Sequence, residues 1–130
     1  MMYDAHVPTK FQDLDHFTTG DLSAAMERND PIELQMVSVT VALSCEDRLI
    51  AQEICLRLSG HSHEKVRGNA IMSLGHLARR FRNLDEQTVK PIIESALQDA
   101  DEYVRVHAKS AADEIHQFLG WSIAGHVYAL

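Results

Sequence analysis

Apolar residues recur along this chain at the spacing of amphipathic helices, and the pattern predicts an all-α fold. In the clearest stretch Val66, Ala70, Leu74 and Leu77 fall on one face, which predicts a helix over about residues 63–81. The same spacing predicts further helices over about residues 21–28, 31–44, 46–58, 85–97 and 101–119. The connections between these helices are therefore expected to be short.

Residues that typically begin or end helices lie at the borders of these segments. Asp30-Pro31 combines an N-cap residue with proline at the first helical position. Gly60 and Gly120 follow the last apolar residues of their helices, where glycine commonly ends a helix. Pro91 lies inside a predicted helix and is expected to kink it or delay its start, because proline cannot donate a backbone hydrogen bond.

Two segments allow more than one interpretation. Residues 36–41 are rich in β-branched side chains and could form a strand by local preference, but the preceding cap and the helical neighbours favour a helix. In the segment 46–58, Leu49 and Leu56 lie away from the main apolar face. A helix that is apolar on two sides is usually buried between neighbours, and we expect this of residues 46–58.

The two ends of the chain are less periodic than its middle. A short helix is expected around Phe11, Leu14 and Phe17, beginning near Pro8. The apolar segment after Gly120 either docks as a cap on the last helix or is disordered.

The chain contains an internal repeat. Residues 63–70 and 101–108 each carry an acid, then Val-Arg, then an alanine, and their valines are 38 residues apart. Residues 46–54 align with residues 85–93 at a shift of 39, so two successive helices repeat in the same order. A repeat of this length is a helical hairpin, which buries its apolar face only by stacking on a neighbour.

The repeated motif, an acid followed by Val-Arg-x-x-Ala-x-x-x-Leu, resembles a HEAT or HEAT-like repeat. The residues that carry the resemblance are Glu64, Val66, Arg67, Ala70, Leu74 and Gly75 in one copy, and Asp101, Val104, Arg105 and Ala108 in the next. Ala112-Asp113 stands where the Leu-Gly pair of the motif would be, and Gln35 replaces the arginine in a degenerate first copy over residues 30–58. The motif is specific for architecture and says little about function.

The resemblance implies a single domain over residues 1–130, a short right-handed α-solenoid of HEAT-like hairpins with an N-terminal helical cap. Its parts are expected to be the cap 1–29, the repeats 30–60, 61–98 and 99–121, and the tail 122–130. Arg67 and Arg105 lie at the edge of the apolar stripe, where their guanidinium groups reach carboxylates such as Asp99 and Asp101. We interpret both arginines as structural.

Charge and composition restrict the possible partners. With 12 basic and 19 acidic residues the chain has a formal net charge of −7, which disfavours nucleic acid and anionic membranes. A basic protein is the expected partner, since opposite fields speed association. Cys45 and Cys55 are expected to be free thiols in a reducing compartment, and with no signal peptide evident we expect a cytoplasmic protein of unknown oligomeric state.

Candidate residues for chemistry are few. His61, His63 and Glu64 are the nearest approach to a metal site, as in the HEAT-like deoxyhypusine hydroxylases, but the next repeat has no histidine at the matching position. The basic cluster Arg79, Arg80 and Arg82 could suggest a HEAT-like DNA glycosylase, but it is better explained as cations at a helix C-terminus. We expect no catalytic residue, no metal and no cofactor.

Protein binding is the function that these observations favour. In HEAT-type stacks the second helices tend to line the concave face, and acids in the flanking loops would rim one edge of it. The candidate partner-binding residues are Glu46, Asp47, Gln52, Glu53, Asp85, Glu86, Gln87, Glu94, Gln98, Asp99 and Asp101. The chain is similar to small HEAT-like immunity proteins that neutralise basic toxins, often nucleases. A scaffold or chaperone subunit, such as a phycobilin lyase, and a metal-dependent hydroxylase remain alternatives.

Overall fold

The computed structural model describes residues 19–128, and within that range the chain forms six α-helices and no strand. The helices are α1 (Thr19–Arg28), α2 (Pro31–Ser44), α3 (Arg48–Leu58), α4 (Glu64–Phe81), α5 (Glu86–Ala96) and α6 (Glu102–Leu119). The all-α prediction is therefore confirmed, and residues 36–41 are helical. The short helix expected around Phe11, Leu14 and Phe17 lies outside the described residues.

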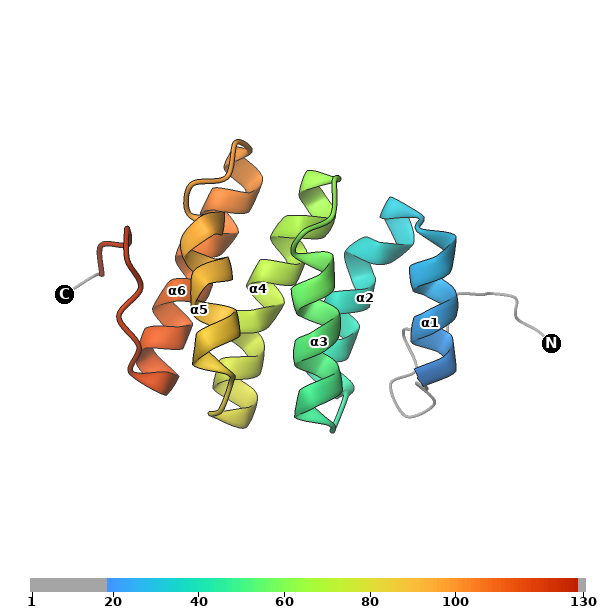
Figure 1. Cartoon of the computed structure of the whole chain (residues 1–130), viewed down its shortest axis with the longest axis horizontal. Helices are drawn as coiled ribbons and strands as arrows, with labels where there is room; N and C mark the ends of the chain where they lie inside the picture. The colour runs from blue at the N-terminus through green and yellow to red at the C-terminus, as the bar shows by residue number, and fades with distance from the viewer. Residues whose placement is uncertain (1–18, 129–130) are drawn as a thin grey trace.

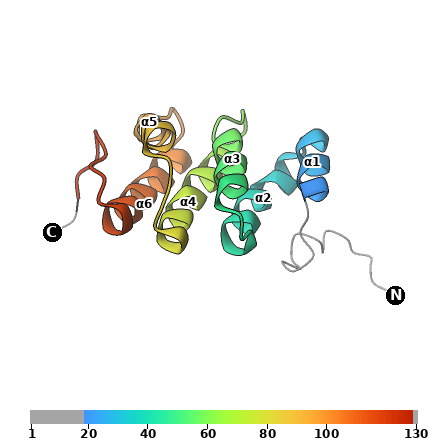
Figure 2. The ribbon, with the colours of Figure 1, turned by 60° about the horizontal axis from the view of Figure 1, so that its bottom comes forward.

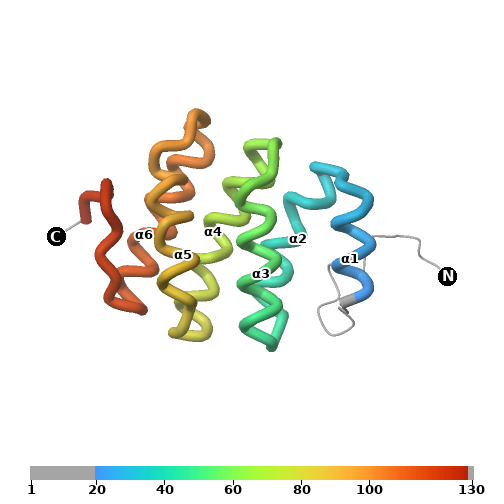
Figure 3. The backbone as a smooth tube through the Cα atoms, in the orientation of Figure 1, coloured from blue at the N-terminus to red at the C-terminus, as the bar shows by residue number. Residues whose placement is uncertain are grey.

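The helices are arranged in two layers (Figure 1). Helices α1, α3 and α5 form one layer and α2, α4 and α6 form the other, as the turned view also shows (Figure 2). The chain crosses from one layer to the other at every connection (Figure 3). The α1–α2, α3–α4 and α5–α6 connections lie at one end of the helices, and the α2–α3 and α4–α5 connections lie at the opposite end. No described helix is long and apolar enough to cross a membrane.

Side chains at the helix N-termini explain where most helices begin. Asp30, Asp47 and Asp101 each accept a hydrogen bond from the backbone N–H two residues further on, and Nδ1 of His63 does the same for α4. Helix α5 begins at Glu86 and continues through Pro91, so the expectation of a delayed start is wrong. Pro91 is exposed, where water can satisfy the carbonyl group that proline leaves without a donor.

The two layers enclose one hydrophobic core. Its largest fully buried side chains include Leu34, Leu58, Leu74, Leu77, Ile93 and Ile115. Leu49 is the exception to the predicted pattern, because its side chain is 64% exposed. The prediction that α3 is buried on two sides is therefore wrong for Leu49, although Leu56 packs partly buried against the core. Helix α3 has core on one side only, since its contacts are with α2 and α4 of the other layer.

Small residues allow α4 and α6 to pack closely. A Cβ atom at Gly68 would lie 2.5 Å from Cδ2 of Tyr103, and one at Gly75 would lie 3.0 Å from Cα of Ala111. Within the layer, α4 packs extensively against both α2 and α6, whereas α3 has far fewer contacts with α1 or α5. The layer formed by α2, α4 and α6 is therefore the more tightly packed of the two.

The segment after α6 packs against the last two helices. Ile123 is only 3% exposed, and its backbone N–H donates to the hydroxyl of Tyr128 (2.7 Å). Ala124 donates its N–H to Oε2 of Glu94 (2.8 Å), which ties the segment to α5. His126 contacts Asp113 of α6 through Nε2 (2.8 Å). Residues 121–128 therefore cover apolar surface at this end of the fold.

Gly75→Ala tests the close contact of α4 with α6. Overpacking typically costs about 1–3 kcal/mol, against up to about 1 kcal/mol gained in helix propensity, so we expect the free energy of unfolding to fall by about 1 kcal/mol in urea denaturation. Gly60→Ala is the matched control, because the nearest atom to its added Cβ would be 3.8 Å away. If Gly75→Ala proves as stable as Gly60→Ala, the steric constraint does not exist.

Candidate partner-binding surface

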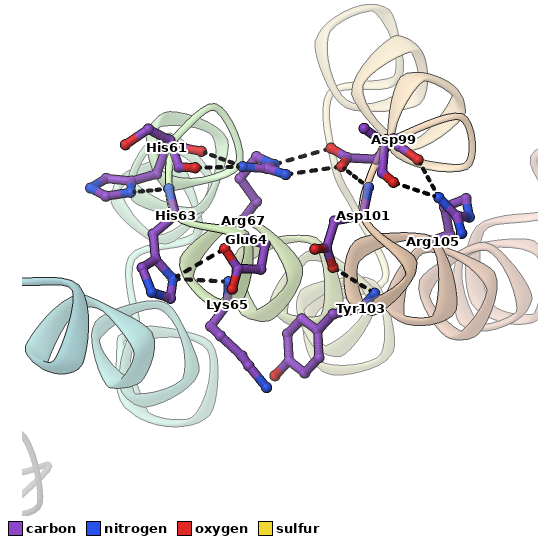
Figure 4. Close-up of polar contacts among 11 residues, drawn as sticks. His61, His63, Glu64, Lys65, Arg67, Asp99, Asp101, Tyr103 and Arg105 are labelled. Carbon is purple, nitrogen blue, oxygen red and sulfur yellow. Dashed lines mark hydrogen bonds and ion pairs between the residues drawn. The ribbon is translucent and has the colours of Figure 1, made fainter.

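A partly buried ion pair links the α3–α4 loop to the α5–α6 loop, at the same end of the helices (Figure 4). Arg67, in the first turn of α4, donates from Nε and Nη2 to both carboxylate oxygens of Asp99, at 3.0 and 2.9 Å. Its Nη1 donates to the backbone carbonyls of His61 and Ser62, at 3.1 and 2.8 Å. Hydrogen bonding to Arg67 is the main reason that the pKa of Asp99 is lowered. Arg67 therefore fixes the α3–α4 loop to the α5–α6 loop.

The same contacts recur one repeat later. Arg105 donates from Nη1 to the carbonyls of Asp99 and Ala100, at 2.7 and 3.0 Å, which matches the contacts of Arg67 with its own loop. The residue two positions before each N-cap also behaves alike: Asp99 accepts from the N–H of Asp101 (2.9 Å), as His61 does from the N–H of His63 (3.0 Å). The prediction that Arg67 pairs with a carboxylate is confirmed for Asp99. Asp101 instead caps α6 by accepting from the N–H of Tyr103.

The histidines near this loop make structural contacts. Nε2 of His61 bonds to Oδ1 of Asn29 (2.7 Å), and Nδ1 of His63 accepts from the N–H of Lys65 (3.1 Å). Burial is the main cause of a lowered pKa at His61, so its neutral form is favoured. Within residues 19–128, no three His, Cys, Asp or Glu side chains lie close enough together to hold a metal ion.

The predicted basic cluster at the end of α4 is divided among different neighbours. Arg79 pairs with Glu114 of α6. Arg80 donates to the backbone carbonyls of Ala42 (3.2 Å) and Cys45 (2.5 Å), at the C-terminal end of α2. The guanidinium of Arg82 lies 5.0 Å from the ring centre of Phe118. Each arginine thus contacts another part of the fold, in addition to lying at the C-terminus of α4.

The acids that were expected to rim one edge lie at two opposite ends of the fold. Glu46 and Asp47 are in the α2–α3 connection, and Asp85 with Glu86 is at the α4–α5 connection. Asp99 and Asp101 belong to the α5–α6 loop at the other end (Figure 1). The prediction of a single acidic rim is therefore wrong. Two helices, α3 and α4, separate the α2–α3 connection from the α4–α5 connection, so both lie at the same end of the fold. Only α5 separates the α4–α5 connection from the α5–α6 loop, so that loop lies at the opposite end.

Three other predicted contact residues have roles inside the fold. Gln52 is only 8% exposed, and its Oε1 accepts from the N–H of Asp85 (2.9 Å), so it is not a surface residue as predicted. The carboxylate of Asp99 is occupied by Arg67. Glu94 is half-buried and accepts from Ala124. The predicted residues that remain exposed are Glu46, Asp47, Glu53, Asp85, Glu86, Gln87 and Gln98.

An apolar groove lies between α1 and α3. Its volume is about 370 Å³, and its lining includes Leu22, Met26, Leu49, Ile50 and Ile54. Glu53 and Arg57 supply its charged side chains. Leu49 stands largely exposed at this groove.

Sequence reasoning missed this groove. Leu49 was predicted to be buried, and the α1 residues Leu22 and Met26 carried no signal beyond helical spacing. The one available signal was the position of Leu49 away from the main apolar face of its helix. That position is compatible with burial under another helix and equally with exposure to a partner.

Comparison of the chain with protein-family models, with curated proteins and with solved structures finds no match.

Asp99→Asn tests the ion pair through its pH dependence. The pKa of Asp99 is lowered from its ordinary value of 3.8, so the ionised carboxylate stabilises the fold above that value. This stabilisation is lost as the pH falls through the lowered pKa. We expect the variant to be about 1 kcal/mol less stable than the parent at pH 7, and the difference to be smaller at pH 2.

The measurement is urea denaturation at both pH values. Glu53→Gln is the control, because Glu53 is exposed and makes no ion pair among the described residues. An Asp99→Asn difference that is equal at both pH values would show that the charge of Asp99 does not stabilise the fold.

Proposed function

We propose that this chain is a non-enzymatic protein-binding module built as a short right-handed α-solenoid of HEAT-like repeats. The repeated loop contacts of Arg67 and Arg105 support the repeat, as do two helix layers that alternate along the chain. The chain divides into an N-terminal cap, repeats over 30–60, 61–98 and 99–121, and a tail over 122–130. The HEAT-like resemblance supports this division.

The binding face is the outer surface of α1, α3 and α5. This layer contains α3 and α5, the second helices of their hairpins, which the resemblance predicts to be binding helices. The groove between α1 and α3 carries the proposal, because an exposed apolar side chain beside a concave apolar lining is typical of interface anchors.

The charge of this face supports a basic partner. Exposed acids on α3, on α5 and in the connections before them include Glu46, Asp47, Glu53, Asp85 and Glu86. Lys90 is within 3.6 Å of Glu86, and Arg57 borders the groove, so cations are fewer there. Together with the net charge of −7, this charge distribution attracts a basic protein and orients it.

The narrower form of the proposal is an immunity protein that neutralises a basic toxin such as a nuclease. It is supported by the resemblance to small HEAT-like immunity proteins and by the acidic face. A photoreactive residue at position 49, introduced into the full chain in its native host, identifies the partner by crosslinking. The expected product is a small basic protein, and crosslinks only to large acidic assemblies would refute the proposal.

Glu53→Lys tests the electrostatic part of the proposal once the crosslinked partner is purified. We expect the association rate constant to fall by about tenfold at low salt, since steering depends on the local field, and the effect to weaken as salt is added. Glu102→Lys makes the same charge change at an exposed site on α6. Stopped-flow kinetics should show a much smaller effect for this control, and equal effects of the two variants would contradict the assigned face.

A further inference from the structure

Helix α2 is apolar on two opposite sides. Its core side buries Leu34, Val37 and Val41. On the opposite side the exposed fractions are 78% for Ile32, 54% for Met36 and 55% for Leu43, with Val39 half-buried among them. A helix that is apolar all round is normally covered on both sides. No described element covers this second side.

The exposed residues of α2 have the spacing of a coiled-coil contact. Ile32, Met36, Val39 and Leu43 follow one another at intervals of four, three and four residues, which is the interval pattern of the apolar positions in a heptad. We call these four residues the α2 seam. It is about 16 Å long at the ordinary rise of an α-helix. This pattern is suited to packing against one further helix.

The surroundings of the α2 seam are nearly free of unpaired charge. The one charged residue of α2, Glu33, accepts two hydrogen bonds from Arg28, at 2.9 and 2.6 Å. Gln35 and Ser44, which flank the seam, are uncharged. Lys65 of the neighbouring helix lies over the ring of Tyr103, 4.4 Å from its centre. A basic partner attracted to the α1, α3 and α5 face therefore has no acid to pair with at the seam.

We propose that the α2 seam binds the α2 seam of a second copy of this chain, with the two helices antiparallel about a twofold axis. The intervals of four, three and four residues are the same in both directions, so antiparallel pairing matches every seam residue. Ile32 then faces Leu43 of the second copy, and Met36 faces Val39 of the second copy. This pairing brings together only apolar side chains and opposes the two helix dipoles.

The size of the contact sets its strength. A stable interface typically buries about 800 Å² on each partner, and a single pair of helices touching over about 16 Å buries less than that. The dimer is therefore reversible, and it forms and dissociates with protein concentration. It leaves the groove between α1 and α3 free, because that groove is on the opposite layer.

Sedimentation of the full chain from about 10 to 500 µM tests the pairing. The expected result is a weight-average mass that rises from 14.6 kDa towards twice that value. Met36→Glu should remove the rise, because antiparallel pairing would place its charge against the apolar seam of the second copy. Leu43→Glu provides a second variant at the end of the seam, and circular dichroism checks that both variants keep their helix content.

Leu49→Glu is the matched control. It adds the same charge at a leucine that is 64% exposed on α3, away from the seam, and it should dimerise like the parent chain. A monomer at every concentration would overturn the proposal, as would a dimer that survives Met36→Glu. Loss of the dimer in Leu49→Glu as well would assign the contact to general charge or to the other face, which also overturns it. None of these results depends on the identity of a binding partner.

Discussion

The close approach of α4 to α6 is the constraint on which the rest of the structure depends. Gly68 leaves room for the ring of Tyr103, and Gly75 leaves room for the backbone of Ala111. This fixes how far the two helices are apart and also their register, because Tyr103 then reaches Asn69 with its hydroxyl group (2.5 Å). The same register places the α5–α6 loop within reach of Arg67. Close packing and the polar contacts between the loops therefore support each other.

Much of the fold was predictable from short-range signals. Within residues 19–128 the N-cap residues and the apolar stripes indicate the number and order of the helices, and the repeated Val-Arg pair predicts equivalent loops. The delayed start expected from Pro91 does not occur, because the cost of proline depends on exposure, which a local pattern does not reveal. Gly75 matched the repeat motif, but its contact with Ala111 depends on how two helices are placed relative to each other, and only the structure shows that.

The candidate site was much less predictable than the fold. Spacing along a helix shows which residues share a face, but it does not show which faces are covered by other helices. The spacing therefore predicts a buried Leu49 and an exposed Gln52, whereas Leu49 is 64% exposed and Gln52 only 8%. The predicted single acidic rim fails for a different reason, because alternating helices put successive loops at opposite ends.

A short helical stack has two ends and two faces through which it can associate. At the C-terminal end, residues 121–128 cover the last helices, with Ile123 3% exposed, so stacking a further hairpin there would displace this segment. Association through the acidic α3 and α5 surface would bring like charges together in a chain of net charge −7. The α2 seam is apolar and nearly neutral, so self-association there avoids this repulsion. The acidic face then stays available for a basic protein, because the two faces belong to opposite layers.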